Sequence, residues 1–239
     1  RIQSLKDKYS LPDEFILTLA MIEPRKNIEA LIHAYSMLPA ELQQRYPMVL
    51  AYKVHPEDLE RILRLAESYG LSRSQLIFTG FLTDDDLIAL YNLCKLFVFP
   101  SLHEGFGLPP LEAMRCGAAT LGSNITSLPE VIGWEDAMFN PHDVQDIRRV
   151  MEKALTDEAF YRELKAHALA QSAKFSWANT AHLAIDGFSR LLQSSKGAHA
   201  GQAEGVTASR IQTMQKIDAL SEVDRLGLAW AVARNGFKQ

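Results

Sequence analysis

The chain has 239 residues, of which 47% are hydrophobic and 23% are charged. This composition excludes intrinsic disorder and predicts a substantial buried core, with one full domain plus an appendage or two small domains. A net charge of −4 and a pI near 6.0 argue against a dedicated nucleic-acid binder, because such proteins carry a basic excess.

Short apolar runs alternate with helical periodicity after an opening helix and turn in residues 1–15. The runs predict strands, because they are brief and bounded by turn residues. The predicted strands are FILTLA (15–20), PMVLAY (47–52), QLIFTG (75–80), KLFVFP (95–100) and AATLGS (118–123). The predicted helices are 28–38, 56–70, 83–94 and 109–116. We expect Asn27 and Thr83 to cap the first and third of these helices and Gly70 to end the second.

This alternation predicts the α/β class: a Rossmann-like parallel sheet with helices on both faces. From Val144 to Leu192 the pattern is helical throughout, with an N-cap expected at Ser176. Residues 194–205 are small, polar and glycine-rich, which predicts a linker, and 208–235 are amphipathic and predicted to be helical. We therefore expect one domain in residues 1–195 and a linker with a helical extension in 196–239.

Cellular context is indicated by what the sequence lacks. Cys94 and Cys116 have no zinc or disulfide spacing, so we expect both to be reduced core residues. No apolar run reaches the ~18 to 20 residues of a membrane span, and no signal-peptide pattern opens the chain, which predicts a cytoplasmic location. The chain begins with Arg1 rather than methionine, and its first residues already fit a helix, so we expect a fragment of a longer protein.

The segment HEGFGLPPLEA (103–113) places Glu104 and Glu112 eight positions apart at the end of a predicted strand. In open α/β sheets, ligands bind beyond the carboxyl ends of the strands. Pro109 and Pro110 suit the first positions of a helix, so Glu104 is expected in the loop and Glu112 in the first turns of the helix. The glycines and the free N–H groups of the helix start could receive a phosphate.

A carboxylate this close to a phosphate would repel it, so Glu112 is expected to accept hydrogen bonds from ribose hydroxyls and Glu104 could face another polyol. The alternative from spacing alone is that Glu112 is favoured by the helix dipole and Glu104 is a solvated loop residue. His103 is interpreted as a loop residue rather than a general base.

The segment EPRKN (23–27) ends the first predicted strand and supplies two adjacent cations. Arg25 and Lys26 could bind a diphosphate, Arg25 through its planar fork and Lys26 as a point charge. The alternative is a solvated turn with a capping asparagine. Other phosphate motifs fail, because Pro110 stands where GxGxxG needs its third glycine and no GxxxxGK[ST] occurs.

EPRKN, FTGFLTDDDLIALY, VFPSLHEGFGLPPLEAMRCG and SNITSLPEV together resemble the C-terminal, donor-binding domain of family 4 glycosyltransferases with the GT-B fold. The resemblance covers about residues 1–193 and is strongest to bacterial mannosyltransferases that build surface polysaccharides. It implies a retaining transfer from a nucleotide sugar, GDP-mannose in particular, without a metal or other cofactor.

The resemblance also implies roles for individual residues. Arg25 and Lys26 would hold the donor diphosphate, Glu104 would contact the transferred sugar, and Glu112 would bind the ribose. The backbone amides of Gly105, Phe106, Gly107 and Leu108 would meet sugar or phosphate.

Three departures from the family pattern stand out: Ala20-Met21 ends the first strand, Ala51-Tyr52 ends the second, and Ala119 replaces a proline. Ala51-Tyr52 is expected to alter the pocket for the nucleotide base.

The resemblance further implies an N-terminal acceptor-binding domain that this chain lacks, so the chain alone is expected not to catalyse transfer. No nucleic acid is expected as a partner, and peripheral membrane association would be a property of the longer protein. Two other functions stay open: a non-catalytic sugar-nucleotide-binding or interaction module, and a GT-B sugar-nucleotide epimerase or phosphorylase-like protein. A glycosidase is disfavoured, because that chemistry gives no reason for phosphate-binding features.

Overall fold

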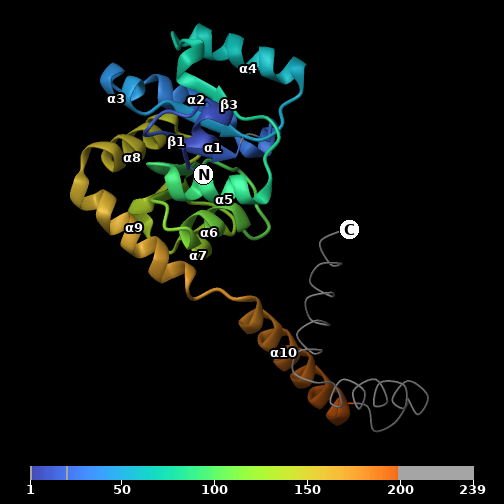
Figure 1. The fold of residues 1–239 in the computed structure, drawn as a ribbon. Helices are drawn as coiled ribbons and strands as arrows, with labels where there is room; N and C mark the ends of the chain where they lie inside the picture. Colours follow the sequence, from blue (N-terminus) through green and yellow to red (C-terminus); the bar gives the residue numbers. More distant parts are fainter. Residues whose placement is uncertain (1, 20, 199–239) are drawn as a thin grey trace. The chain divides into compact units, whose positions relative to one another are not determined.

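The fold is described from a computed structural model that covers residues 2–19 and 21–198. Its centre is a six-stranded sheet in the order β3-β2-β1-β4-β5-β6, in which every neighbouring pair is parallel (Figure 1). The predicted α/β class with a Rossmann-like parallel sheet is confirmed. The strands are β1 Ile16–Leu19, β2 Met48–Ala51, β3 Leu76–Phe78, β4 Leu96–Phe99, β5 Thr120–Ser123 and β6 Met138–Phe139.

The central strands are apolar because both of their faces are covered. Every residue of β2 and β4 is buried, as a parallel sheet between two helical layers requires. In β1, Ile16 lies between Met48 of β2 and Leu96 of β4 in the sheet register. The first and fourth strands in chain order are therefore direct neighbours, which brings the loops that follow them to one place at the carboxyl edge.

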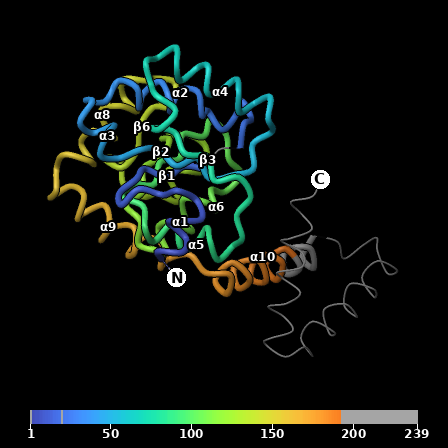
Figure 2. Tube along the Cα trace, turned by 45° about the horizontal axis from the view of Figure 1, so that its top comes forward, coloured from blue at the N-terminus to red at the C-terminus, as the bar shows by residue number. Residues whose placement is uncertain are grey.

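Helices cover both faces of the sheet, as Figure 2 shows with helices above and below the strands. On one face α2 packs against α4 and α8, and on the other α6 packs against α5, α7 and α9. The helices are α1 Ile2–Tyr9, α2 Ile28–Ser36, α3 Ala40–Arg45, α4 Pro56–Ser68, α5 Asp84–Leu93, α6 Leu108–Arg115, α7 Leu128–Ile132, α8 Val144–Thr156, α9 Glu158–Ser172 and α10 Trp177–Ala198, with 3-10 turns η1 Pro24–Lys26, η2 Arg73–Gln75 and η3 Glu135–Ala137.

The predicted helix caps are confirmed at two positions. The Thr83 hydroxyl accepts a hydrogen bond from the Asp86 amide at 3.2 Å, and the Ser176 hydroxyl accepts one from the Asn179 amide at 3.1 Å. The prediction that the Asn27 side chain caps α2 was wrong. Asn27 precedes α2 but makes no side-chain cap hydrogen bond, because its amide is bonded elsewhere.

The helical region after residue 144 forms three helices: the N-cap at Ser176 predicted the start of the last one, but the sequence did not predict the division between α8 and α9. Asp157 ends α8 and caps α9, and a break between Ser172 and Trp177 precedes α10. Residues 194–198 continue α10, so the prediction of a linker beginning at 194 was wrong there; serine and alanine allow a helix to continue. Residue 20 and residues 199–239, with the rest of that linker and the predicted helix 208–235, lie outside the described residues.

Contacts divide the chain into a compact unit Arg1–Ala173 and a second unit that begins at Lys174. The sheet and helices α1 to α9 belong to the first unit. Cys94 is buried in it and Cys116 is partly buried against its core, both as free thiols, as predicted. Within residues 2–19 and 21–198, no helix combines the length and the apolar character needed to cross a bilayer.

Candidate functional site

The candidate site lies at the point where the strand order reverses. From the centre of the sheet, β1, β2 and β3 follow one another toward one edge, and β4, β5 and β6 follow one another toward the other edge. The loops after β1 and β4 therefore diverge from a shared point at the carboxyl edge, the usual place for a ligand in such sheets. EPRKN follows β1 and HEGFGLPP follows β4, so both segments singled out in the sequence meet here.

The loop after β1 forms the short turn η1 and buries a charged residue. Lys26 is only 8% exposed, and its ammonium lies 5.1 Å from the centre of the Phe99 ring. Arg25 is more exposed and donates to the Glu23 carboxylate at 2.7 Å. The alternative of a solvated turn is therefore wrong for Lys26, because a lysine is buried only when its charge has a partner.

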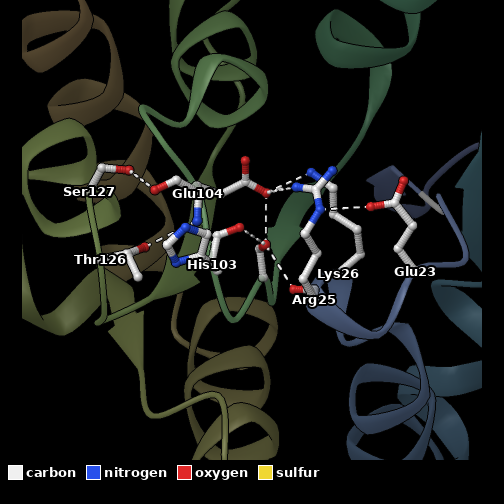
Figure 3. A network of polar contacts seen from close by, with 8 residues as sticks. Glu23, Arg25, Lys26, His103, Glu104, Thr126 and Ser127 are labelled. Atoms are coloured by element: carbon white, nitrogen blue, oxygen red, sulfur yellow. Dashed lines mark hydrogen bonds and ion pairs between the residues drawn. The ribbon is translucent and has the colours of Figure 1, made fainter. Parts of the chain in front are cut away.

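That partner is Glu104, 78 residues later in the chain. The Lys26 ammonium donates to Glu104 Oε1 at 2.6 Å, and Arg25 Nη1 lies 3.6 Å from the same oxygen. The side chains of Lys26 and Glu104 are 10% and 11% exposed, so this pair is largely removed from water. Figure 3 shows the Glu104 carboxylate directed toward the two cations. Glu104 is therefore an ion-paired group and not the solvated loop residue of the alternative interpretation.

A buried serine joins the two loops beneath this pair. The Ser101 hydroxyl lies 2.7 Å from Glu104 Oε1 and 3.0 Å from the Arg25 carbonyl. The Arg25 carbonyl also accepts a hydrogen bond from the Leu102 amide at 2.7 Å. Because Ser101 is fully buried, these contacts fix the start of the β4 loop against the β1 loop.

The loop after β5 holds the Glu104 backbone from the other side. The Ser127 hydroxyl donates to the Glu104 carbonyl at 3.1 Å, and the Glu104 amide donates to the Thr126 hydroxyl at 3.4 Å (Figure 3). Thr126 has a φ of 57°, a left-handed conformation that is uncommon for threonine. Sequence reasoning assigned no role to these two residues. The available signal was a pair of hydroxyl residues in the loop that follows a predicted strand.

Gly107 sets the direction in which α6 leaves the loop. Its φ of 101° and ψ of 44° are left-handed, and a Cβ built on it would lie 2.8 Å from Leu128 Cδ2. Helix α6 begins at Leu108, one residue before the predicted start, with Pro109 and Pro110 in its first turn, where their missing N–H groups cost little. Gly105, Phe106 and Leu108 are exposed around this helix start.

Glu112 lies in the middle of α6 and contacts α5 rather than the lysine–glutamate pair. Tyr91, which is buried, donates its hydroxyl hydrogen to Glu112 Oε2 at 3.3 Å. Much of the Glu112 side chain is exposed, but Tyr91 screens one side of its carboxylate from water. This partial burial raises the pKa of Glu112 above its usual value, and the hydrogen bond from Tyr91 opposes the shift. The carboxylate therefore has free oxygen capacity on its solvent side.

The remaining sequence candidates are peripheral. His103 is exposed, as expected of a loop residue, and its carbonyl lies 3.3 Å from the Ser101 hydroxyl. Met21 is half-buried after β1, whereas Ala20 lies outside the described residues. In the part of the chain that the structure describes, no three histidine, cysteine, aspartate or glutamate side chains gather as metal ligands would.

Comparison with known families and proteins agrees with this geometry. Residues 3–174 match the family model described as "Glycosyl transferases group 1". The serotype-specific mannosyltransferase WbdA of Escherichia coli is 95% identical over 238 residues, which cover 100% of this chain and 29% of WbdA. The O-antigen chain mannosyltransferase B of Escherichia coli is 39% identical over 77% of this chain and 48% of its own length. The chain thus spans less than half of either relative.

Solved structures show the same fold. A sucrose-phosphate synthase from Thermosynechococcus elongatus superposes with a TM-score of 0.66 at 25% identity, over 81% of this chain and 49% of that one. WaaG, a glycosyltransferase involved in lipopolysaccharide biosynthesis, superposes with a TM-score of 0.62 at 20% identity, over 73% of this chain and 47% of its own. The predicted resemblance to one half of a GT-B fold is confirmed.

Proposed function

The chain belongs to the group 1 glycosyl transferases, and from this premise we propose that it is the nucleotide-sugar donor-binding domain of a retaining mannosyltransferase. The near-identical relative is a mannosyltransferase and the second is an O-antigen chain mannosyltransferase, which supports mannosyl transfer in surface-polysaccharide synthesis. GDP-mannose is the proposed donor. The rest of the longer polypeptide would supply the acceptor-binding domain, and we propose that residues 1–195 form the donor domain and 196–239 lead toward a further domain.

The observation that carries this proposal is the buried Lys26–Glu104 pair at the strand-order reversal. The donor is a diphosphate ester whose leaving group gains negative charge as the glycosidic bond breaks. Lys26, with Arg25 beside it, supplies fixed positive charge where that charge develops, which is the electrostatic form of catalysis. Positive charge near the leaving oxygen makes departure of the nucleotide easier without a metal.

Glu104 has two uses in this arrangement. Without donor it is the counter-ion that allows Lys26 to be buried. When a diphosphate takes over the cations, the Glu104 carboxylate becomes free to accept hydrogen bonds from hydroxyls of the sugar. We therefore assign the sugar contact to Glu104, and the diphosphate contact to Lys26 and Arg25.

The β4 loop and α6 would bind the remainder of the donor. The backbone amides of Gly105, Phe106, Gly107 and Leu108 lie just before and at the start of α6, where the positive end of the helix dipole attracts phosphate or sugar oxygens. Glu112 has exposed oxygen capacity and would accept the ribose hydroxyls. Its contact with Tyr91 limits the directions that its carboxylate can take.

A calorimetric titration of the 239-residue chain with GDP, UDP and ADP tests donor binding. Half of a binding cleft should bind GDP at ~0.1 to 1 mM, which is about 4 to 5.5 kcal/mol. Lys26→Ala and Glu112→Ala should each weaken binding. Lys165→Ala and Glu163→Gln on the exposed surface of α9 are matched controls and should leave it unchanged. If UDP or ADP binds more tightly than GDP, the proposed donor is wrong.

A second experiment tests transfer. WbdA carrying this chain's sequence in its matching region would be assayed with GDP-mannose. Glu104→Gln should lower transfer by about 100-fold or more while GDP still binds, because the sugar contact contributes at the transition state. A protein that binds GDP-mannose but transfers nothing would favour the non-catalytic module, and an epimerised sugar product would favour the epimerase.

A further inference from the structure

Asn27 has an unusual backbone for a residue next to a binding lysine. It lies between η1, which ends at Lys26, and α2, which begins at Ile28, with φ 56° and ψ 32°. These angles are left-handed, a conformation that strains most side chains and that asparagine tolerates better than nearly all others. The backbone alone would be satisfied by glycine, so the presence of a side chain at this position calls for a separate reason.

The Asn27 amide group uses both of its hydrogens on backbone carbonyls of other loops. Nδ2 donates to the Pro100 carbonyl at 3.2 Å and to the Pro141 carbonyl at 2.8 Å. Both prolines are buried, Pro100 directly after β4 and Pro141 shortly after β6. One side chain therefore connects the carboxyl ends of β1, β4 and β6. A carboxylate of the same shape could not make these bonds, because it has no hydrogen to donate.

These bonds bracket Lys26. On its N-terminal side the Arg25 carbonyl accepts from the Leu102 amide at 2.7 Å, and on its C-terminal side Asn27 donates to the carbonyl of Pro100, the residue that directly follows β4. The backbone of Lys26 is thus fixed at both ends to the segment that carries Glu104. We propose that Asn27 is a positioning residue that holds the Lys26 ammonium at the diphosphate position, an inference that rests on the proposed function for its catalytic meaning.

Three substitutions separate this role from a purely conformational one. Asn27→Gly keeps the left-handed backbone available and removes both hydrogen bonds. Asn27→Asp keeps the shape, removes both donors and places negative charge beside two carbonyl oxygens. Ser10→Gly is the matched control, because Ser10 is an exposed residue with a φ of 52° in the loop before β1, at the opposite edge of the sheet.

A measurement without ligand tests the positioning directly. Amide hydrogen exchange at Leu102, whose N–H is bonded to the Arg25 carbonyl, reports whether the two loops stay joined. Asn27→Gly and Asn27→Asp should accelerate exchange at Leu102 by about tenfold, whereas amides in the central strands of both variants should exchange as in the wild type. In the Ser10→Gly variant, exchange at Leu102 should be unchanged. Unaltered exchange at Leu102 in both variants would overturn the inference, whatever the protein binds.

The ligand measurement is a double-mutant cycle for GDP affinity. Asn27→Gly should weaken GDP binding by about tenfold in the wild-type background and by less than about twofold when Lys26 is already alanine. An equal loss in both backgrounds would mean that Asn27 supports the fold in general, and the inference would fail. If the wild-type chain binds none of GDP, UDP and ADP, the proposed function fails instead, and Leu102 exchange still decides the structural claim.

Discussion

Replacing Lys26 by methionine should destabilise the chain more than any exposed lysine substitution would. The change keeps the apolar stem and removes the ammonium, which leaves the Glu104 carboxylate 11% exposed without its nearest cation. Two groups could partly compensate: Arg25 Nη1 at 3.6 Å and the Ser101 hydroxyl at 2.7 Å.

The magnitude follows from the burial of the pair. Removing one partner of a buried ion pair typically costs about 3 to 5 kcal/mol. The remaining hydrogen bond to a charged group offsets about 1 to 2 kcal/mol of this. Lys26→Met should therefore lower the free energy of unfolding by about 1 to 4 kcal/mol, which corresponds to a Tm lower by about 2 to 16 °C for a chain of this size. Glu104→Gln should cost less, about 1 to 3 kcal/mol, because a glutamine can still accept from Lys26.

The assay is urea unfolding followed by circular dichroism at low and high salt. The double variant Lys26→Met/Glu104→Gln should be more stable than the sum of the two single changes predicts by about 1 to 2 kcal/mol, since no buried charge remains unpaired. The control is Arg162→Met, which breaks an ion pair with Glu158 whose side chains are 76% and 61% exposed and should cost under about 0.5 kcal/mol. Additive single changes, or a Lys26→Met cost as small as the control, would refute the claim that the pair is desolvated.

Three further predictions concern pH and backbone geometry. The pKa of Glu112 is raised in the folded protein, so the stability that its protonated form provides is complete below pH 4.5 and is lost as the pH rises through the raised pKa. Glu112→Gln removes this loss, so the variant should become more stable than the wild type toward pH ~8 in urea unfolding experiments. Hydrogen bonds from Lys8 and Tyr9 of α1 lower the pKa of Asp86 to about 2. The stability that the ionised Asp86 carboxylate contributes is therefore present above pH 3.8 and is lost as the pH falls through about 2. Asp86→Asn should flatten the acid limb of a Tm-versus-pH curve over this window. Gly107→Ala should lower the unfolding free energy by about 1 to 3 kcal/mol through its positive φ and the 2.8 Å approach to Leu128, whereas Gly80→Ala, with φ 71° and open space around it, should cost only about 1 kcal/mol.

The sheet could be predicted from sequence because its strands are short, continuous apolar runs bounded by turn residues. Five of the six strands were found in this way. Strand β6 has two residues, Met138–Phe139, and α7 has five, Leu128–Ile132, so neither is long enough to show a period. Their places are set by the sheet edge and by packing on β5, which are properties of the assembled fold rather than of the local sequence.

The candidate site was predicted as two separate loops and not as an ion pair. Sequence patterns place Lys26 and Glu104 after two strands but give no strand order. Their contact depends on β1 lying beside β4, with Ile16 opposite Leu96. The role of Asn27 was mistaken for the same reason. Its local position fits a helix cap, and the carbonyls that it bonds belong to residues 73 and 114 positions away.

The ion pair also accounts for the burial of a cation at the proposed donor site. Lys26 is only 8% exposed, and burying its charge without a partner would be costly. Glu104 neutralises Lys26, and under the proposed function an incoming diphosphate would replace Glu104 as the counter-ion. Stability and the proposed donor binding therefore depend on the same two side chains. The double variant should recover part of the stability that the single changes lose, but because it lacks the Lys26 ammonium it should bind GDP no better than Lys26→Met does.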